Sequence, residues 1–282
     1  IVKNIFNEAD ETLNYLLSKT ILDGPAKELN KTEFTQPAIF LVSYSIYKLV
    51  SVEFGINLHK AKYFAGHSLG EYSALACSGA LEFKETLKIL NKRGKAMQSA
   101  VPNNSGGMLV VINSSIPEIE NIITHNKIDC FIANDNSPNQ IVISGLKENI
   151  ELLSNVFTEK KIKNLSIPVS APFHCKLMNK ATKNMDQEIN KINFKNLNVP
   201  IISNVTAEEV GDKNLLANLL LRQIESRVRW RESINFMISN NINQFIEIGP
   251  GKVLSNLIRR SDKNLKVNAI NNEKDITDLK IL

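Results

Sequence analysis

The sequence predicts an α/β fold in which a larger subdomain is interrupted by a smaller one. Helical and strand patterns alternate over residues 1–105 and again from residue 168 onward, as they do in α/β units. Between these parts the order of elements is β-α-β-β-α-β, which is the ferredoxin-like plan. A chain of 282 residues with 43% hydrophobic content can bury a core of this size. We therefore expect a large subdomain from residues 1–105 and 168–282, and a small one from residues 106–167.

The first part of the chain is predicted to be mostly helical. Apolar residues recur at helical spacing, and one short aromatic, apolar stretch with the pattern of a buried strand stands among them. The helices are expected at 1–20, 36–54, 71–77 and 84–100, and the strand at 62–65. The strand, a glycine-flanked turn and a helix of small residues thus follow one another directly at 62–77.

The residue pattern changes after the loop at 102–107, where β-branched residues, which favour strands, become frequent. In the small subdomain we expect strands at 108–112, 130–134, 140–144 and 163–167, helices at 115–125 and 146–161, and a turn at 136–139. In the rest of the chain we expect helices at 175–192, 214–224, 230–240 and 252–260, and strands at 200–204 and 244–249. The Pro250-Gly251 pair ends the last of these strands.

Charge and composition exclude several classes of protein. The net charge of +5 and the pI near 9.0 come from lysines scattered along the chain, which indicates a solvated surface, although they leave an acidic partner possible. The basic clusters at 227–231 and 259–260 lack interleaved stacking aromatics, so we expect no nucleic-acid binding. The three cysteines have no metal-ligand spacing, and their odd number favours reduced thiols, so we expect neither a metal site nor a disulfide.

Location follows from two further absences in the sequence. The most apolar run, 38–52, is interrupted by polar residues, so no membrane span is expected. The chain does not start with a signal peptide. We expect a cytoplasmic protein, or an organelle protein whose targeting segment is not part of this sequence.

Residues Gly66 to Gly70 form a G-x-S-x-G pentapeptide between the predicted strand and helix. A serine on such a sharp turn takes strained backbone angles, and we expect side chains at either glycine to collide with the neighbouring strand and helix. The turn would expose the Oγ atom of Ser68 as a nucleophile. The backbone N–H of Leu69, at the start of the helix, would donate to an oxyanion. The alternative is a tight turn that the serine merely caps.

A nucleophilic serine needs a base, and the chain has four histidines. His67 adjoins Ser68 and should point away from its Oγ, as a packed and hydrogen-bonded residue of the turn. His59 and His125 lie in polar segments that we expect to be exposed. His174 lies in a loop just after the small subdomain ends, where catalytic residues are often displayed. His174 is therefore the candidate base, with a surface histidine as the alternative.

Several ordered motifs together resemble the malonyl-CoA:acyl carrier protein transacylases that load malonyl units for fatty-acid synthesis. The matching segments span nearly the whole chain and are Thr35–Ala38, Gly66–Leu75, Arg93-Gly94, Ala133-Asn134, Asn136–Pro138, Val142–Gly145, Ser170–His174, Arg229-Trp230 and Ile248–Leu254. The resemblance implies an α/β-hydrolase-like large subdomain with a parallel sheet and a ferredoxin-like insert, in agreement with the periodicity.

The resemblance also implies roles for individual residues. Ser68 would be the nucleophile, His174 its base, and Arg93 the group that binds the free carboxylate of malonate, steadied by Gln36. A buried carboxylate is costly unless a planar, permanently charged group meets it, which suits arginine. The backbone carbonyl of Gln223 would orient His174 in place of the usual acid. From the residues alone, Arg93 and Gln223 could equally be exposed helix residues, and Gln36 an ordinary residue near a helix start.

The implied reaction has two steps. Ser68 takes the malonyl group from malonyl-CoA, and the malonyl-serine passes it to the phosphopantetheine thiol of acyl carrier protein. No cofactor is implied beyond the coenzyme A thioester itself, and we expect a monomer. The ring of Phe173 would crowd the α-carbon of the acyl group and favour malonyl over methylmalonyl, unless it only packs the loop.

Three alternatives stay open, and one segment of the family pattern is not found. The rival functions are a serine esterase or thioesterase on a similar fold, a polyketide-type acyltransferase, and a non-catalytic scaffold that binds carrier protein. Members of the family begin with a strand and a G-Q-G-x-Q loop, which this sequence does not contain. We expect the working protein to have leading residues that supply this loop.

Overall fold

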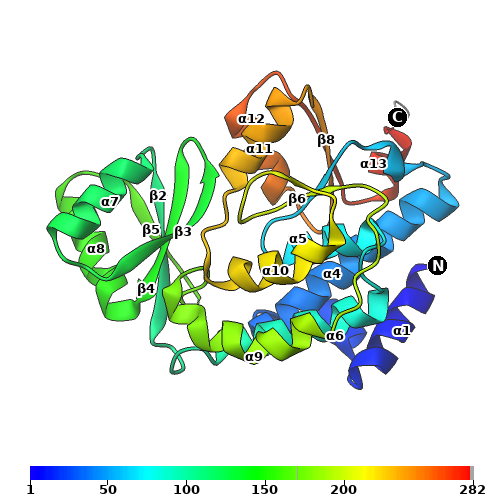
Figure 1. The fold of residues 1–282 in the computed structure, drawn as a ribbon, viewed down its shortest axis with the longest axis horizontal. Coiled ribbons are helices and arrows are strands. Elements are labelled where there is room, and N and C mark those ends of the chain that lie inside the picture. The colour runs from blue at the N-terminus through cyan, green and yellow to red at the C-terminus, as the bar shows by residue number, and fades with distance from the viewer. Residues whose placement is uncertain (170, 280–282) are drawn as a thin grey trace.

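The computed structural model describes residues 1–169 and 171–279. A four-stranded sheet with two helices lies to one side, and a larger group of helices around short strands lies to the other (Figure 1). This mixture of helices and parallel strand pairs confirms the α/β class. None of the described helices has the length and apolar character needed to span a membrane. The exact subdomain boundaries at residues 106 and 167 stay a prediction.

The four-stranded sheet is antiparallel and has the strand order β3-β4-β2-β5. Its elements are β2 (Gly106–Ile112), α7 (Ile116–His125), β3 (Cys130–Ser137), β4 (Gln140–Leu146), α8 (Lys147–Glu159) and β5 (Asn164–Ile167). This is the ferredoxin-like order expected from the sequence. Leu109 opposite Ile143 and Val111 opposite Ile141 point to one face, where both helices cover them in a buried apolar cluster. The periodicity of two in these strands therefore located the small core correctly.

The larger part contains short strands in two separate sheets. They are β1 (Phe64–Ala65), β6 (Ile201–Ile202), β7 (Glu209–Val210), β8 (Gln244–Ile248) and β9 (Lys266–Ile270). β1 pairs with β6, and β8 with β9, both in parallel, whereas β7 is antiparallel to β6. The strand β9 was not expected from the sequence, because its pattern is only half apolar. Its parallel pairing with β8 is visible only in the structure.

Helices make up most of the larger part. They are α1 (Val2–Leu13), α2 (Leu17–Asp23), α3 (Ala26–Leu29), α4 (Thr32–Lys48), α5 (Leu69–Cys77), α6 (Phe83–Gln98), α9 (Asn179–Asn190), α10 (Leu216–Glu225), α11 (Trp230–Ser239), α12 (Val253–Ser261) and α13 (Glu273–Thr277). Short single-turn helices lie at Leu49–Glu53, Leu58–Lys60, Lys176–Met178 and Lys213–Leu215.

Some expected boundaries were wrong. The helix expected at 1–20 is two helices, because Asn14 adopts a left-handed conformation (φ 58°) that ends α1. The helix expected to begin at Gln36 already begins at Thr32, and Pro37 lies inside it. Pro37 has no N–H for the carbonyl of Glu33, and the side-chain amide of Asn91 in α6 donates to that carbonyl instead, at 3.0 Å. The helix therefore tolerates this proline through a contact that sequence periodicity does not reveal.

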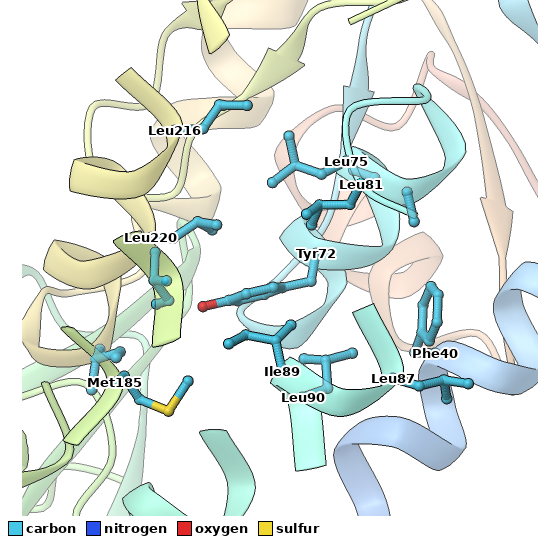
Figure 2. Close-up of a cluster of buried hydrophobic side chains, with 14 of the residues drawn as sticks. Phe40, Tyr72, Leu75, Leu81, Leu87, Ile89, Leu90, Met185, Leu216 and Leu220 are labelled. Atoms are coloured by element: carbon cyan, nitrogen blue, oxygen red, sulfur yellow. The ribbon is translucent and has the colours of Figure 1, made fainter. Parts of the chain in front are cut away.

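The main apolar core lies between α4, α5, α6, α9 and α10 (Figure 2). Figure 2 shows Tyr72 among Ile89, Met185 and Leu220, with Phe40 beside Leu87 at the edge of the cluster. Burying such side chains removes apolar surface from water and is the main source of stability. This core therefore fixes α5 and α6, the helices that carry the candidate nucleophile and the candidate carboxylate-binding arginine.

Two sets of contacts join the small sheet to the rest of the molecule. The backbone of β3 bonds with residue Val228, whose N–H donates to Ala133 and whose carbonyl accepts from Asp135. The fully buried carboxylate of Asp135 also accepts three bonds from the guanidinium of Arg231 in α11, at 2.8–3.0 Å. The basic cluster at 227–231 thus pairs internally, since Arg227 and Arg229 both contact Glu232.

Candidate active site

Ser68 stands at the turn between β1 and α5, in a strained conformation. Its φ is 54° and its ψ is −108°, a region that side-chain-bearing residues rarely occupy. The turn leaves the serine as the N-cap of α5, and Leu69 is the first helical residue, so its N–H has no acceptor inside the helix. The structure therefore has the elbow geometry expected from the pentapeptide.

The two glycines of the pentapeptide do not have the same importance. A Cβ on Gly66 would lie 2.0 Å from the carbonyl carbon and oxygen of Gly70, which the backbone cannot accommodate. A Cβ on Gly70 would meet no atom within 4 Å. The expectation that both positions exclude a side chain was therefore wrong for Gly70, because it faces open space instead of the neighbouring strand.

The Oγ atom of Ser68 lies 2.7 Å from Nε2 of His174. On the other side of the ring, Nδ1 lies 2.9 Å from the backbone carbonyl oxygen of Gln223. A carbonyl can only accept, so Nδ1 carries the proton and donates, and in the neutral ring Nε2 accepts from the serine. Burial, and secondly the nearby charge of Arg93, lowers the pKa of His174 to about 3, so the ring is neutral near pH 7.

Arg93 reaches the same place from α6 and is almost completely buried, with 1% of its surface exposed. Its Nη2 donates to the Oγ of Ser68 at 3.1 Å, and also to the side-chain oxygen of Gln223 at 2.9 Å. Its Nη1 donates to Oε1 of Gln36 at 2.7 Å, and its Nε–H has no partner in the part of the chain that the structure describes. The alternative of an exposed surface arginine is therefore excluded.

Close packing of α4 on α6 makes this approach possible. A Cβ on Gly94 would lie 2.5 Å from the carbonyl oxygen of Thr32, so only glycine allows the two backbones to come so near. Gln36, buried in α4, is thereby brought to Arg93. The sequence pair Arg93-Gly94 thus combines a charged group with the residue that lets its helix dock.

A family model described as an acyl transferase domain matches residues 3–280. A malonyl CoA-acyl carrier protein transacylase of Bacillus subtilis is 38% identical over 278 residues, covering 97% of this chain and 86% of the relative. The chain belongs to the malonyl-CoA:acyl carrier protein transacylase family.

Solved structures of the family have the same fold. The acyl-carrier-protein-S-malonyltransferase of Bartonella henselae superimposes with a TM-score of 0.94 at 38% identity, covering 98% of this chain and 89% of that one. A malonyl-transacylase in complex with a type II PKS acyl-carrier protein superimposes with a TM-score of 0.93 at 35% identity, covering 98% and 89%. These likenesses confirm the fold that the motifs implied.

The other histidines of this transacylase lie outside the serine's contacts. Nε2–H of His67 donates to Oδ1 of Asn136 at 2.9 Å, and the ring packs beside Trp230, as expected for a hydrogen-bonded residue of the turn. Burial lowers its pKa. His59 and His125 are exposed.

Phe173 is half-buried in this transacylase and joins two apolar clusters. It packs against the main core and against the cluster of Met108, Ala133 and Val142 in the small sheet. Its backbone carbonyl accepts from the hydroxyl of Ser144 at 2.6 Å. Phe173 therefore has a packing role whatever its influence on the acyl group. Ser170, the first residue of its motif, lies outside the described residues.

Sequence reasoning missed three polar groups of this transacylase. The carboxylate of Glu71, the side chain of Asn204 and the side-chain amide of Gln223 are all buried around the backbone of Ser68. An acid within a helix of small apolar residues, and an asparagine where a strand ends, were signals that could have pointed to them. Among the described residues no group of three or more His, Cys, Asp or Glu side chains is arranged to hold a metal.

Proposed function

We propose that the protein transfers the malonyl group of malonyl-CoA to the phosphopantetheine thiol of acyl carrier protein, through a malonyl ester on Ser68, for fatty-acid synthesis. One observation carries the proposal. A hydroxyl, an imidazole and a guanidinium from three distant parts of the chain meet, with Oγ of Ser68 at 2.7 Å from His174 and 3.1 Å from Arg93.

His174 acts as the base in the first step. As Oγ of Ser68 attacks the thioester carbonyl, its proton passes to Nε2, and the carbonyl of Gln223 keeps the ring oriented through Nδ1. When the tetrahedral intermediate collapses, the carbon–sulfur bond breaks and the coenzyme A thiolate takes the proton. The second step reverses this sequence with the thiol of the carrier protein as the nucleophile.

The N–H of Leu69 and Arg93 bind the charges that the reaction brings. Leu69 begins α5, so its N–H and the positive end of the helix face the carbonyl oxygen as it becomes negative. Acylation turns Oγ of Ser68 into an ester oxygen, a weak acceptor, which frees one N–H of Nη2 of Arg93, and the Nε–H has no partner among the described residues. A planar cation with free N–H groups in a buried place suits the free carboxylate of the acyl group.

The arrangement favours transfer over hydrolysis. A serine hydrolase acting on an ester or amide usually orients its histidine with an acid, whereas His174 has a backbone carbonyl in that place, which is adequate for a more reactive thioester. A buried cation beside the nucleophile would serve no purpose with an uncharged acyl group.

The same proposal covers the partner, the oligomeric state and the acyl preference. Acyl carrier protein is the macromolecular partner, coenzyme A enters only as part of the substrate, and the enzyme works as a monomer. Its three cysteines are free thiols, which suits a reducing cytoplasm. Phe173 selects malonyl over methylmalonyl by crowding the α-carbon.

Trapping of the acyl-enzyme tests the function. The purified protein is mixed with malonyl-CoA labelled in the malonyl group, and the label on the protein is chased with holo acyl carrier protein or with buffer. We expect label on Ser68 that carrier protein removes much faster than water does. Faster release by water would support a hydrolase, and absence of label would contradict the proposal.

Matched serine variants assign the label. Ser68→Ala should take up none, whereas Ser73→Ala, which removes a hydroxyl from the same helix, should be labelled like the parent protein. Label that persists in Ser68→Ala would overturn the nucleophile assignment.

A further inference from the structure

A buried acid lies beneath the nucleophile, and none of the steps above uses it. Glu71 is in the first turn of α5 and has 1% of its surface exposed. One of its oxygens, Oε2, accepts from the backbone N–H of Asn204 at 3.2 Å and from Nε2 of Gln223 at 2.5 Å. A single carboxylate oxygen therefore joins the segment after β6 to helix α10, directly behind Ser68.

Both ends of the Ser68 residue are held by these same partners. Its N–H donates to Oδ1 of Asn204 at 2.7 Å, and its carbonyl accepts from Nε2 of Gln223 at 3.0 Å. Ser68 has a positive φ, which is unfavourable unless the surroundings impose it. The position of Oγ thus depends on two residues that Glu71 anchors, Asn204 by its backbone and Gln223 by its side chain.

The side-chain amide of Gln223 can satisfy its neighbours in only one orientation. Its Oε1 accepts from Nη2 of Arg93, and its Nε2 donates to Glu71. A guanidinium has only donors and an ionised carboxylate only acceptors, so the reversed amide would place two donors against each other and two acceptors against each other. The carboxylate of Glu71, together with the carbonyl of Ser68, therefore stabilises the orientation in which Gln223 presents an acceptor to Arg93.

Glu71 is also the charge that complements Arg93. Arg93 forms no ion pair with a carboxylate within residues 1–169 and 171–279, and an uncompensated buried cation is costly. Glu71 and Arg93 attract each other across the amide of Gln223, and each favours the ionised form of the other.

We propose that Glu71 is a positioning residue for malonyl transfer: its ionised carboxylate, acting through the side-chain amide of Gln223, holds Ser68 and Arg93 in the arrangement that reacts. The inference rests on the function proposed above, and it gives Gln223 a second task besides orienting His174. Protonation of Glu71 would weaken the preference for this amide orientation and would remove the charge that complements Arg93.

The groups around Glu71 make this a pH-dependent device. Arg93 faces it from α6, Gln223 from α10, and Ser203 and Asn204 from the segment that follows β6. Burial raises the pKa of Glu71 to about 7, against the opposing effects of the hydrogen bond from Gln223 and the charge of Arg93. His174, with its pKa lowered to about 3, does not titrate in this range.

The test compares the pH dependence of malonyl-enzyme formation in the parent protein and in Glu71→Gln. In the parent, kcat for label uptake should fall as the pH is lowered through about 7. Glu71→Gln keeps the shape without the charge, so its rate should be about tenfold lower at alkaline pH and flat across this range, as expected for a lost charge-assisted contact. The parent at low pH and the variant should then have similar rates.

Glu85→Gln is the matched control. Glu85 occupies the third position of α6, as Glu71 does in α5, and lies away from the serine. It should follow the parent profile, which would show that loss of a first-turn acid alone does not change the rate. Thermal unfolding of each variant is measured in parallel, because a purely structural defect lowers stability and activity together at every pH.

Gln223→Met is a second variant that tests the role of Glu71, and it does so even if Glu71→Gln fails to fold. This variant keeps the backbone carbonyl that orients His174 and removes only the amide. The fall of the labelling rate below about pH 7, called the acid limb, should therefore flatten although Glu71 is present. The double variant should lose no more activity than the more impaired single variant, because both changes break one connection.

Two results would overturn the inference. One is an acid limb that persists unchanged in Glu71→Gln or in Gln223→Met, and the other is losses that multiply in the double variant. If the parent protein takes up no malonyl label, the proposed function fails. If the parent takes up malonyl label and the acid limb persists in the variants, the proposed function stands and only the role of Glu71 fails.

Discussion

His174 lies 2.7 Å from Ser68 although 106 residues separate them in the chain. The whole small sheet is inserted between the two, so the pair forms only when the chain leaves the larger part and returns to it (Figure 1). The return is precise because Phe173, next to the histidine, packs against the main core and against the cluster of Met108, Ala133 and Val142 in the small sheet. The contact between Ser68 and His174 is therefore a property of the junction between the two parts.

Arg93→Ala should reduce malonyl transfer by about a hundredfold, because the malonyl carboxylate would be buried without its charged partner. Transfer of an acetyl group should fall much less, so the acetyl-to-malonyl ratio rises. The measurement is label uptake from the two coenzyme A thioesters. Lys92→Ala, the exposed neighbour that pairs with Glu188, is the control and should change neither rate. Equal loss for both acyl groups would contradict the role of Arg93.

Phe173→Ser should widen the acyl preference. Removal of the ring leaves space beside the α-carbon, so the ratio of methylmalonyl to malonyl transfer should rise by about tenfold. The same change should lower the unfolding free energy by about 3 kcal/mol, since the ring packs in two clusters. Competition between the two thioesters measures the first effect and urea unfolding the second. An unchanged ratio in a folded variant would leave Phe173 with a packing role alone.

The two glycines of the elbow should respond differently to alanine. Gly66→Ala should destabilise the protein by about 3 kcal/mol or more, because the new methyl overlaps backbone atoms that no side-chain rotation can move. Gly70→Ala should change stability by no more than about 1 kcal/mol, in the stabilising direction, since it lies in open space within a helix. Thermal or urea unfolding of the two variants distinguishes these outcomes, and similar values for both would contradict the geometry of the turn.

Buried His174 should make stability depend on pH. Its pKa is lowered in the folded state to about 3, whereas the unfolded chain has the ordinary value of 6.5. The unfolded state therefore binds a proton that the folded state does not, and this stability is present above pH 6.5 and lost as the pH falls towards 3.

His174→Gln isolates this contribution from that of other titrating groups. The unfolding free energy of the parent relative to the variant should fall by about 2 kcal/mol between about pH 7.5 and about pH 5. Urea unfolding of both proteins at the two pH values measures it. A difference that does not change with pH would mean that His174 is not buried as a neutral ring.

The junction between the two parts should depend on one ion pair. Arg231→Met leaves the carboxylate of Asp135 buried and unpaired, at a cost of about 3 kcal/mol or more. Lys195→Met removes an exposed pair with Glu82, at less than about 1 kcal/mol. Equal small losses in urea unfolding would show that Asp135 finds other partners.

The sequence by itself determined the local features of this protein. The pentapeptide indicated Ser68, the periodicity of two predicted the small sheet, and the ordered motifs indicated the family. Each of these signals depends only on residues that are close together in the sequence. Boundaries failed where a distant group intervened, as at Pro37, whose missing hydrogen bond is replaced by Asn91 from another helix.

Only the tertiary structure decided which polar groups meet. It brought Gln36, Arg93, His174 and Gln223 together around the serine from four separate parts of the chain. It also revealed Glu71 and Asn204, whose local signals in the sequence do not show that they are buried beside Ser68. Whether a glutamate is exposed on a helix or buried under a nucleophile depends on what packs over it. That is decided by apolar burial across the whole chain, which no short segment encodes.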